Sequence, residues 1–217
     1  MKYLSEYQLE VKNTERLERK FIMSQGQSYG ALAILLNFGF SKCHPDRLVN
    51  SIYFDDIEHS SLADNVEGSP SRDKLRARYY GSLPGAVSVE IKHRRYHIGY
   101  KSVFRLEERV QTSQHLVRSV EKWCDVNLLN KVFPAAYVRY ERSYFSFGKY
   151  RLTIDRNIEA GRLSNGVELI SPLRNYEVIE FKYPINLDTN FREIFSHIDK
   201  FALRNTKSSK YSNALMW

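Results

Sequence analysis

The stretch Lys74-Leu75-Arg76-Ala77-Arg78-Tyr79 alternates strictly between cationic and apolar residues. Successive side chains of an extended strand point to opposite faces, so the alternation predicts a strand with three cations on one face and an apolar opposite face. Charged and apolar residues alternate in the same way over residues 89–94, 151–155 and 179–183. If such faces converge inside one barrel, they line a channel that binds a polyanion and its metal ions.

Strand signals dominate the rest of the chain. Segments rich in Val, Ile, Tyr and Phe between turn residues predict strands over 18–23, 49–55, 74–80, 86–93, 100–106, 137–145, 150–155 and 176–183. Apolar spacing predicts helices over 28–40, 113–124 and 190–203, whereas the tail 204–217 has no clear periodicity. We therefore expect an α+β fold in which eight antiparallel strands form a closed barrel with a few flanking helices.

Length and charge narrow the class of protein. The 217 residues suit a single domain over 1–217, and the net charge of +8 favours an anionic partner. Two cysteines without metal-ligand spacing indicate a reducing compartment. No apolar run is long enough to cross a bilayer. These features predict a soluble cytoplasmic protein, with peripheral attachment at the inner face of a membrane left open.

Cations and carboxylates share the predicted charged faces. Arginine binds phosphate with paired hydrogen bonds and lysine adds a point charge, so a triphosphate calls for several of both. The candidates for such binding are Lys74, Arg76, Arg78, Lys92, Arg94, Lys101, Arg105, Arg142, Arg151 and Lys182. Carboxylates among them suit Mg²⁺ or Mn²⁺, with Glu180 first and Glu18, Glu90 and Asp155 after it. The competing interpretation is a set of solvated strand faces with surface ion pairs.

Other common site signatures are not apparent. We see no Ser/His/Asp or Cys/His arrangement, no metal-binding histidine cluster and no glycine-rich phosphate loop. The charged strands therefore carry the functional prediction.

An ordered set of short motifs resembles a known family. The motifs run from Glu18-Arg19-Lys20 through residues 51–56, 74–81, 89–92, 140–142, 151–155 and 177–182 to Lys207-Ser208-Ser209-Lys210-Tyr211. Their succession resembles the VTC domain, the catalytic domain of vacuolar transporter chaperone polyphosphate polymerases and their bacterial relatives. That family belongs to the triphosphate tunnel metalloenzymes, in which an eight-stranded antiparallel barrel forms a tunnel.

The resemblance implies ATP-dependent elongation of inorganic polyphosphate with Mn²⁺ or Mg²⁺ and release of ADP. By position it implies phosphate-binding or catalytic roles for Lys20, Arg76, Arg78, Lys92, Arg142, Arg151 and Lys210, with Lys101 and Lys207 beside them, and a metal site at Glu180. ATP and polyphosphate are the expected partners, and nucleic acid is not expected. Because family polymerases work with membrane proteins and this chain shows no membrane segment, a separate membrane-protein partner is a further hypothesis.

Two departures from the family pattern bear on the reaction. Arg16 stands where the wider superfamily has its first glutamate, and Ser208 replaces the phenylalanine of the tail motif. The incomplete carboxylate set favours polymer synthesis over hydrolysis. Two alternatives stay open: a tunnel-type triphosphatase or nucleotide phosphohydrolase, and a non-catalytic module that binds polyphosphate or RNA through basic and aromatic residues.

Overall fold

One antiparallel sheet dominates the computed structural model, which describes residues 16–96, 98–127, 131–164, 167–172, 176–201, 203, 206 and 209–216. Its strands are β1 (Arg16–Met23), β2 (Ser41–Asp55), β3 (Ser71–Tyr80), β4 (Ser88–Arg95), β5 (Ile98–Arg105), β6 (Phe133–Phe147), β7 (Tyr150–Ser164), β8 (Val167–Pro172) and β9 (Glu177–Pro184). The helices are α1 (Gln25–Phe38), α2 (Ser60–Glu67), α3 (Ser113–Asn127), α4 (Asp188–Ser196) and α5 (Lys210–Met216), with 3-10 turns at Ile185–Leu187 and Asp199–Phe201.

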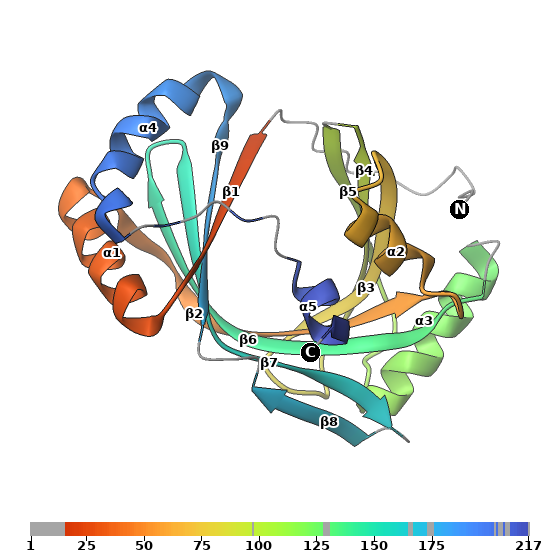
Figure 1. The fold of residues 1–217 in the computed structure, drawn as a ribbon. Coiled ribbons are helices and arrows are strands. Elements are labelled where there is room, and N and C mark those ends of the chain that lie inside the picture. Colours follow the sequence, from red (N-terminus) through yellow and green to blue (C-terminus); the bar gives the residue numbers. More distant parts are fainter. Residues whose placement is uncertain are drawn as a thin grey trace.

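The sheet curls until distant strands face each other. Its strands follow the order β1-β9-β7-β6-β2-β3-β4-β5, with β8 paired to β7 beside this path. Although β1 and β4 lie far apart in this order, the Nζ of Lys92 on β4 comes within 3.4 Å of the Oε2 of Glu18 on β1. The face that carries these two residues is therefore concave and encloses a lumen, with α5 on the same side (Figure 1).

The sheet does not close, which corrects the expectation of a closed barrel. Within the described residues, no ladder of backbone hydrogen bonds joins β1 to β5. Side chains and the C-terminal segment bridge this seam instead. The amide of Thr206 donates to the carbonyl of Lys20 at 2.8 Å, and Lys74 Nζ donates to Ser209 Oγ at 2.9 Å. The tunnel-like antiparallel architecture and the α+β class are confirmed.

Two helical layers cover the convex face of the sheet. Helices α1 and α4 pack on β1, β7 and β9 through residues such as Leu35, Phe181 and Phe191. Helix α3 packs on β3 and β4, where Leu75 and Val89 are buried beside Val120. The apolar residues of the alternating segments on β3, β4 and β9 are thus buried under helices, as predicted. The lumen side of β2 and β6 also carries an apolar cluster, in which Val49 and Val138 pack with Tyr211 of α5.

Element boundaries differ from the predictions where local hydrogen bonds decide them. Helix α1 begins at Gln25 because Ser24 and Gln27 form a capping box, and it ends before Gly39, whose φ of 115° suits glycine. The predicted helix 190–203 is wrong in extent: α4 ends at Ser196, and a 3-10 turn follows. Helix α2, strand β8 and the first half of β2 were not predicted.

Candidate functional site

The strand register places the predicted cations on one face. Cross-strand neighbours share a face of the sheet, and the register pairs Lys74 with Lys92, Lys92 with Lys101, and Arg151 with Lys182. The described candidates that share the lumen face or reach into it are Glu18, Lys20, Lys74, Arg76, Arg78, Glu90, Lys92, Lys101, Arg142, Arg151, Glu180, Lys182 and Lys210. Lys207 lies outside the described residues, so its predicted role stays a prediction.

Glu90 is the centre of the first charged group. It accepts hydrogen bonds from Arg76 Nε at 2.8 Å and from Lys101 Nζ at 3.0 Å. Burial alone would raise the pKa of Glu90, but the charges of Arg76, Arg78 and Lys101 outweigh burial and lower it to about 2. Arg78 is 9% exposed and donates to the hydroxyls of Ser51 and Tyr140. These contacts hold the side chains of Arg76 and Arg78 in place.

Asp155 is the centre of the second group. It is 1% exposed, and it accepts two hydrogen bonds from Arg142, at 2.6 and 2.8 Å. Lys210 of α5 reaches the same carboxylate at 2.5 Å and lies 4.6 Å from the centre of the Tyr140 ring. Burial would raise the pKa of Asp155, but the charges of Arg142 and Lys210 outweigh it and hold that pKa below its ordinary value. The C-terminal helix is therefore tied into the lumen by charge.

The third charged group lies on β1 and β9, where two lysines lie between two glutamates. Lys20 Nζ lies 3.4 Å from Glu180 and 3.9 Å from Glu18, and Lys182 Nζ lies 3.6 Å from Glu180 and 3.1 Å from Glu18. Burial opposes ionisation of Glu180, but the charges of Lys20 and Lys182 outweigh it and hold the Glu180 pKa well below its ordinary value. Both lysines thus stand between the two carboxylates.

These residues fit a metal ion that is shared with substrate. Among the described residues, no group of three or more His, Cys, Asp or Glu side chains is arranged to hold a metal ion. Mg²⁺ usually takes one or two carboxylates and completes its shell with phosphate oxygens and water. Glu180 and Glu18 supply two ionised carboxylates on adjacent strands, which suits this mode. Glu90 is bound to Arg76 and Lys101, and Glu180 and Glu18 are each bound to Lys20 and Lys182, so the metal role of all three stays a prediction.

Some lumen cations have no carboxylate partner. Among the described residues, no ion pair or hydrogen bond involves the guanidinium of Arg151 or of Arg47, both of which are exposed. Within the described part of the chain, Lys74 donates to two neutral acceptors, Asn65 Oδ1 at 2.5 Å and Ser209 Oγ at 2.9 Å. Burial, followed by repulsion from Lys92, Arg72, Lys20 and Arg76, lowers the pKa of Lys74 to about 7. These groups have unused capacity for an anion.

Tyrosines on the lumen face were missed by the sequence reasoning. Tyr53 stacks on Tyr211 of α5 with ring centres 5.1 Å apart, and its hydroxyl lies 3.4 Å from Arg76. Tyr140 accepts a hydrogen bond from Arg78 and lies under Lys210. The strand alternation contained the signal, because Tyr140 has the same parity as Arg142.

A Ser–His–Asp chain, which we did not expect from the sequence, lies on the convex face. His93 Nδ1 is 2.8 Å from Asp73 Oδ1, and His93 Nε2 is 3.2 Å from Ser102 Oγ. Both Ser102 and His93 are buried, and Arg95 also donates to Asp73. The chain links β3, β4 and β5 and has no accessible nucleophile, so its role is structural.

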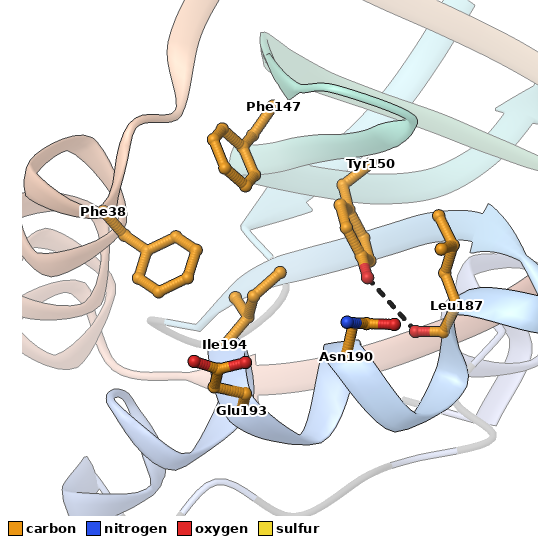
Figure 2. A pocket seen from close by; sticks show the side chains of 7 residues that line it. All are labelled: Phe38, Phe147, Tyr150, Leu187, Asn190, Glu193 and Ile194. Carbon is orange, nitrogen blue, oxygen red and sulfur yellow. Dashed lines mark hydrogen bonds between the residues drawn. The ribbon is translucent and has the colours of Figure 1, made fainter.

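A pocket also lies on the convex side, away from the lumen. Figure 2 shows its lining, in which Phe38, Phe147 and Ile194 surround Tyr150, whose hydroxyl donates to the carbonyl of Leu187 at 3.1 Å. Apart from Glu193 the lining side chains are uncharged. This lining therefore lacks the cations that a phosphate-binding site requires.

The described part of the chain contains no helix that is long and apolar enough to span a bilayer. The predicted membrane-protein partner stays a prediction.

The curled antiparallel sheet with its charged lumen defines a triphosphate-tunnel fold. The VTC domain family model matches residues 2–216, and the chain belongs to that family. A search of curated proteins found no match.

Solved structures share the fold at low sequence identity. A proposed adenylyl cyclase from Hippeastrum, described as having a dominant triphosphatase activity, has a TM-score of 0.60 and 13% identity, covering 91% of this chain and 93% of its own. A proposed adenylate cyclase from Bacillus halodurans has a TM-score of 0.55 and 16% identity, covering 90% and 95%. One from Vibrio parahaemolyticus has a TM-score of 0.53 and 11% identity, covering 91% and 96%. Family and fold together support phosphoryl transfer of the tunnel type.

Proposed function

We propose that this protein synthesises inorganic polyphosphate from ATP by metal-assisted phosphoryl transfer inside the lumen. The observation that carries the proposal is the convergence of cations from β1, β3, β4, β5, β6, β7, β9 and α5 on the concave side of the sheet. Cations on all sides suit a linear chain of phosphates, whereas a flat basic patch would suit a surface. A terminal phosphate oxygen of the growing polymer attacks the γ-phosphorus of ATP. The bond from that phosphorus to the bridging oxygen breaks, and ADP leaves with the electron pair.

The paired cations supply preorganised charge for this reaction. Glu90 holds Arg76, and Asp155 holds Arg142, so neither guanidinium has to be ordered when substrate arrives. Both arginines retain donors for phosphate oxygens, because a guanidinium has five N–H groups. Arg151, with which no carboxylate among the described residues pairs, adds further charge, and Lys74 adds charge when it is protonated. Lys92, Lys101, Lys182 and Lys210 complete the wall of the lumen.

Glu180 and Glu18 are the proposed metal ligands. A divalent ion bound there together with phosphate oxygens would shield the negative charge of the transferring group. The two carboxylates stay ionised at neutral pH because Lys20 and Lys182 lower the cost of their charge. The ion would be Mn²⁺ or Mg²⁺, which both prefer oxygen ligands.

The low pKa values of the lumen carboxylates favour transfer to phosphate over transfer to water. General-base catalysis of hydrolysis is most effective when the base, which takes a proton from the attacking water, has a pKa near the working pH. Glu90 has a pKa of about 2, and that of Glu180 lies well below its ordinary value, so both are weak bases. A terminal phosphate oxygen is already an anion and needs no base. The acceptor that fits this lumen is therefore a phosphate chain.

The test is incubation with ATP and Mn²⁺, followed by gel electrophoresis and assays of ADP and free phosphate. The proposal predicts a polymer ladder and ADP in amounts that match the phosphate incorporated. Arg76→Ala and Glu180→Gln should both abolish the ladder. Free phosphate without polymer would replace the proposal by a triphosphatase, and binding of phosphate chains without turnover would replace it by a binding module.

A further inference from the structure

Two arginines on the lumen wall formed by β3 and β4 have no role in the proposed reaction. Arg72 of β3 and Arg94 of β4 are direct cross-strand partners. The next lumen-facing pair along the same two strands is Lys74 and Lys92. Side chains two residues apart share one face of a strand, so the arginines face the lumen beside these lysines. We refer to Arg72 and Arg94 as the distal arginine pair.

The carboxylate that adjoins this pair in sequence lies on the opposite face of the sheet. Asp73, the only acidic residue of β3, accepts a hydrogen bond on the convex side from Arg95 Nη1 at 2.7 Å. Among the described residues, no ion pair joins a carboxylate to Arg72 or to Arg94. Like charges directly opposite each other destabilise a sheet. The stability of the fold therefore does not explain why two cations face each other here.

Backbone carbonyls position both guanidinium groups without neutralising them. Arg72 Nη1 donates to the carbonyl oxygen of Ser69 at 2.5 Å. Arg94 Nε donates to the carbonyl oxygen of Tyr96 at 2.9 Å. A guanidinium has five N–H groups, so each arginine keeps further donors for another acceptor. Both arginines are also partly exposed to solvent. The pair is thus ordered, charged and accessible, which suits the binding of an anion.

The pair continues the row of cations on β3 beyond the proposed reaction site. The residues of β3 that face the lumen at successive positions are Arg72, Lys74, Arg76 and Arg78. Burial, followed by repulsion from Lys92 and then from Arg72, lowers the pKa of Lys74 to about 7, which agrees with one shared face. A strand advances about 6.6 Å over two residues, so Arg72 lies that far beyond Lys74 and about 13 Å beyond Arg76.

The neighbouring strands place no cation of the reaction site level with this pair. On β5, the residue opposite Arg94 is Gly99. On the other side, the register between β2 and β3 ends at Phe54 and Leu75, before it reaches Arg72. Arg72 is the second residue of β3, and Arg94 is the last but one of β4. The distal arginine pair therefore lies at the edge of the lumen wall.

A long chain of linked phosphates is the ligand that matches this row of cations. From Arg72 to Arg78 the strand measures about 20 Å, which is longer than three linked phosphates. A longer chain can contact the reaction site and the distal arginine pair at the same time. Sites for single-stranded nucleic acid combine cations with aromatic rings for base stacking. No aromatic residue interrupts the cations on this face of β3 between Arg72 and Arg78.

We propose that Arg72 and Arg94 form a distal subsite for the polyphosphate chain, beyond the site of phosphoryl transfer. This inference rests on the proposed function and adds the direction in which the polymer extends. The chain runs from the reaction site past Lys74 and Lys92 to the edge of the β3–β4 wall. The distal subsite makes the protein bind long chains more tightly than short ones.

The test compares two probes by calorimetry in the presence of Mn²⁺. Inorganic tripolyphosphate is short enough to report the reaction site alone, whereas long-chain polyphosphate also reaches the distal subsite. The double variant Arg72→Gln/Arg94→Gln is expected to weaken binding of the long chain about tenfold and binding of tripolyphosphate less than about twofold. For the long chain, the slope of log affinity against log salt concentration should fall by about one for each arginine removed.

Two further variants separate a charge at this position from charge in general. Arg72→Lys/Arg94→Lys keeps both charges and should retain most of the affinity for the long chain. Arg118→Gln/Lys122→Gln removes two exposed charges from α3, which covers the convex side of β3 and β4, and should change neither affinity. In urea denaturation, Arg72→Gln/Arg94→Gln should be at least as stable as the wild-type protein, because it relieves a repulsion.

The distal subsite is overturned if Arg72→Gln/Arg94→Gln binds the long chain as the wild-type protein does. Equal weakening of both probes would also overturn it, because the arginines would then belong to the reaction site. If an RNA oligonucleotide displaces the long chain as well as polyphosphate itself does, a nucleic-acid groove replaces the subsite. Wild-type protein that binds neither probe would reject the proposed function together with the subsite. Wild-type binding of tripolyphosphate with an unresponsive double variant would reject the subsite alone.

Discussion

The two ends of the lumen use arginine in opposite ways. Near α5, Arg142 shares the buried Asp155 with Lys210, and Arg76 is bound to Glu90. Toward the hairpin end, Arg151 is exposed, as is Arg47 opposite Arg142, and no carboxylate among the described residues pairs with either. Paired buried charges stabilise the fold and position their groups. Unpaired exposed charges contribute little to the fold and are available to substrate. Substitutions at the paired residues should therefore lower the free energy of unfolding, whereas substitutions at the unpaired arginines should weaken substrate binding.

The largest effect is expected at the end near α5. Asp155→Asn leaves Arg142 and Lys210 without their shared counter-charge in a site where the carboxylate is 1% exposed. Loss of one partner of a buried ion pair typically costs about 3–5 kcal/mol of the free energy of unfolding. Urea denaturation measures this cost. A loss below about 1 kcal/mol would show that water, and not charge pairing, solvates these cations.

Arg151→Gln should produce the converse result at the open end. Its side chain is exposed, so the free energy of unfolding should change by no more than about 0.5 kcal/mol. The loss of a charged donor to phosphate should weaken tripolyphosphate binding by about ten- to a hundredfold. The matched control is Lys149→Gln in the turn between β6 and β7, which removes a nearby exposed charge. Equal weakening by both variants would indicate only a general charge effect.

The pH dependence of phosphate binding tests the role of Lys74, which has no carboxylate partner among the described residues. Its pKa is lowered to about 7, so above pH 7 it is mostly neutral in the free protein. A bound phosphate chain favours the charged form, and binding above pH 7 therefore takes up a proton. The affinity for tripolyphosphate should fall by up to about tenfold per pH unit between pH 7.5 and 9.

In Lys74→Gln, the affinity for tripolyphosphate should lose the part of its pH dependence that comes from Lys74. The part that comes from Lys92, whose pKa is also lowered by burial, should remain. Calorimetry in two buffers of different ionisation enthalpy counts the protons taken up. Identical proton uptake by wild-type protein and Lys74→Gln would contradict the assignment to Lys74.

In the folded protein alone, the lowered pKa of Lys74 has a second consequence. Between about pH 7 and the ordinary lysine value of 10.5, the unfolded chain binds more protons at this residue than the folded chain does. The contribution of Lys74 to the free energy of unfolding therefore increases with pH in this window. Substrate binding and stability should thus respond to pH in opposite directions.

The smallest effect is expected for the hydroxyl of Tyr53. Tyr53→Phe keeps the stacking on Tyr211 and removes a long hydrogen bond to Arg76, at 3.4 Å. A loss of about 0.5–1.5 kcal/mol in the free energy of unfolding is expected. Tyr53→Leu, which also removes the stacking, should cost more. Equal losses in the two variants would show that the ring does not anchor α5.

The strand faces could be predicted because alternation is a local property of the sequence. Arg76 and Arg78 share a face in any extended strand, and their neighbours Leu75 and Ala77 are buried under α3 as expected. The convergence of the charged faces also follows from the family resemblance. The site residues could therefore be named before any contact was known.

Which charged residues pair, and whether the sheet closes, depend on contacts between distant parts of the chain. The local alternation of residues does not encode these contacts. The pairing of Lys210 with Asp155 joins residues 55 positions apart, and nothing local indicates that the tail forms α5 against Tyr53. The open seam between β1 and β5 was likewise unpredictable, since it depends on contacts between residues far apart in the sequence, such as that of Thr206 with Lys20 of β1. The Ser–His–Asp chain was missed for the same reason, because its members lie on three strands.

The most direct test of a phosphate-binding lumen is a crystal structure with a non-hydrolysable ATP analogue and Mn²⁺. We predict phosphates between Arg76, Arg142 and Arg151, with the metal ion at Glu180 and Glu18. Phosphates bound on the convex surface would contradict this account. So would a lumen that contains no ligand at a saturating concentration of the analogue.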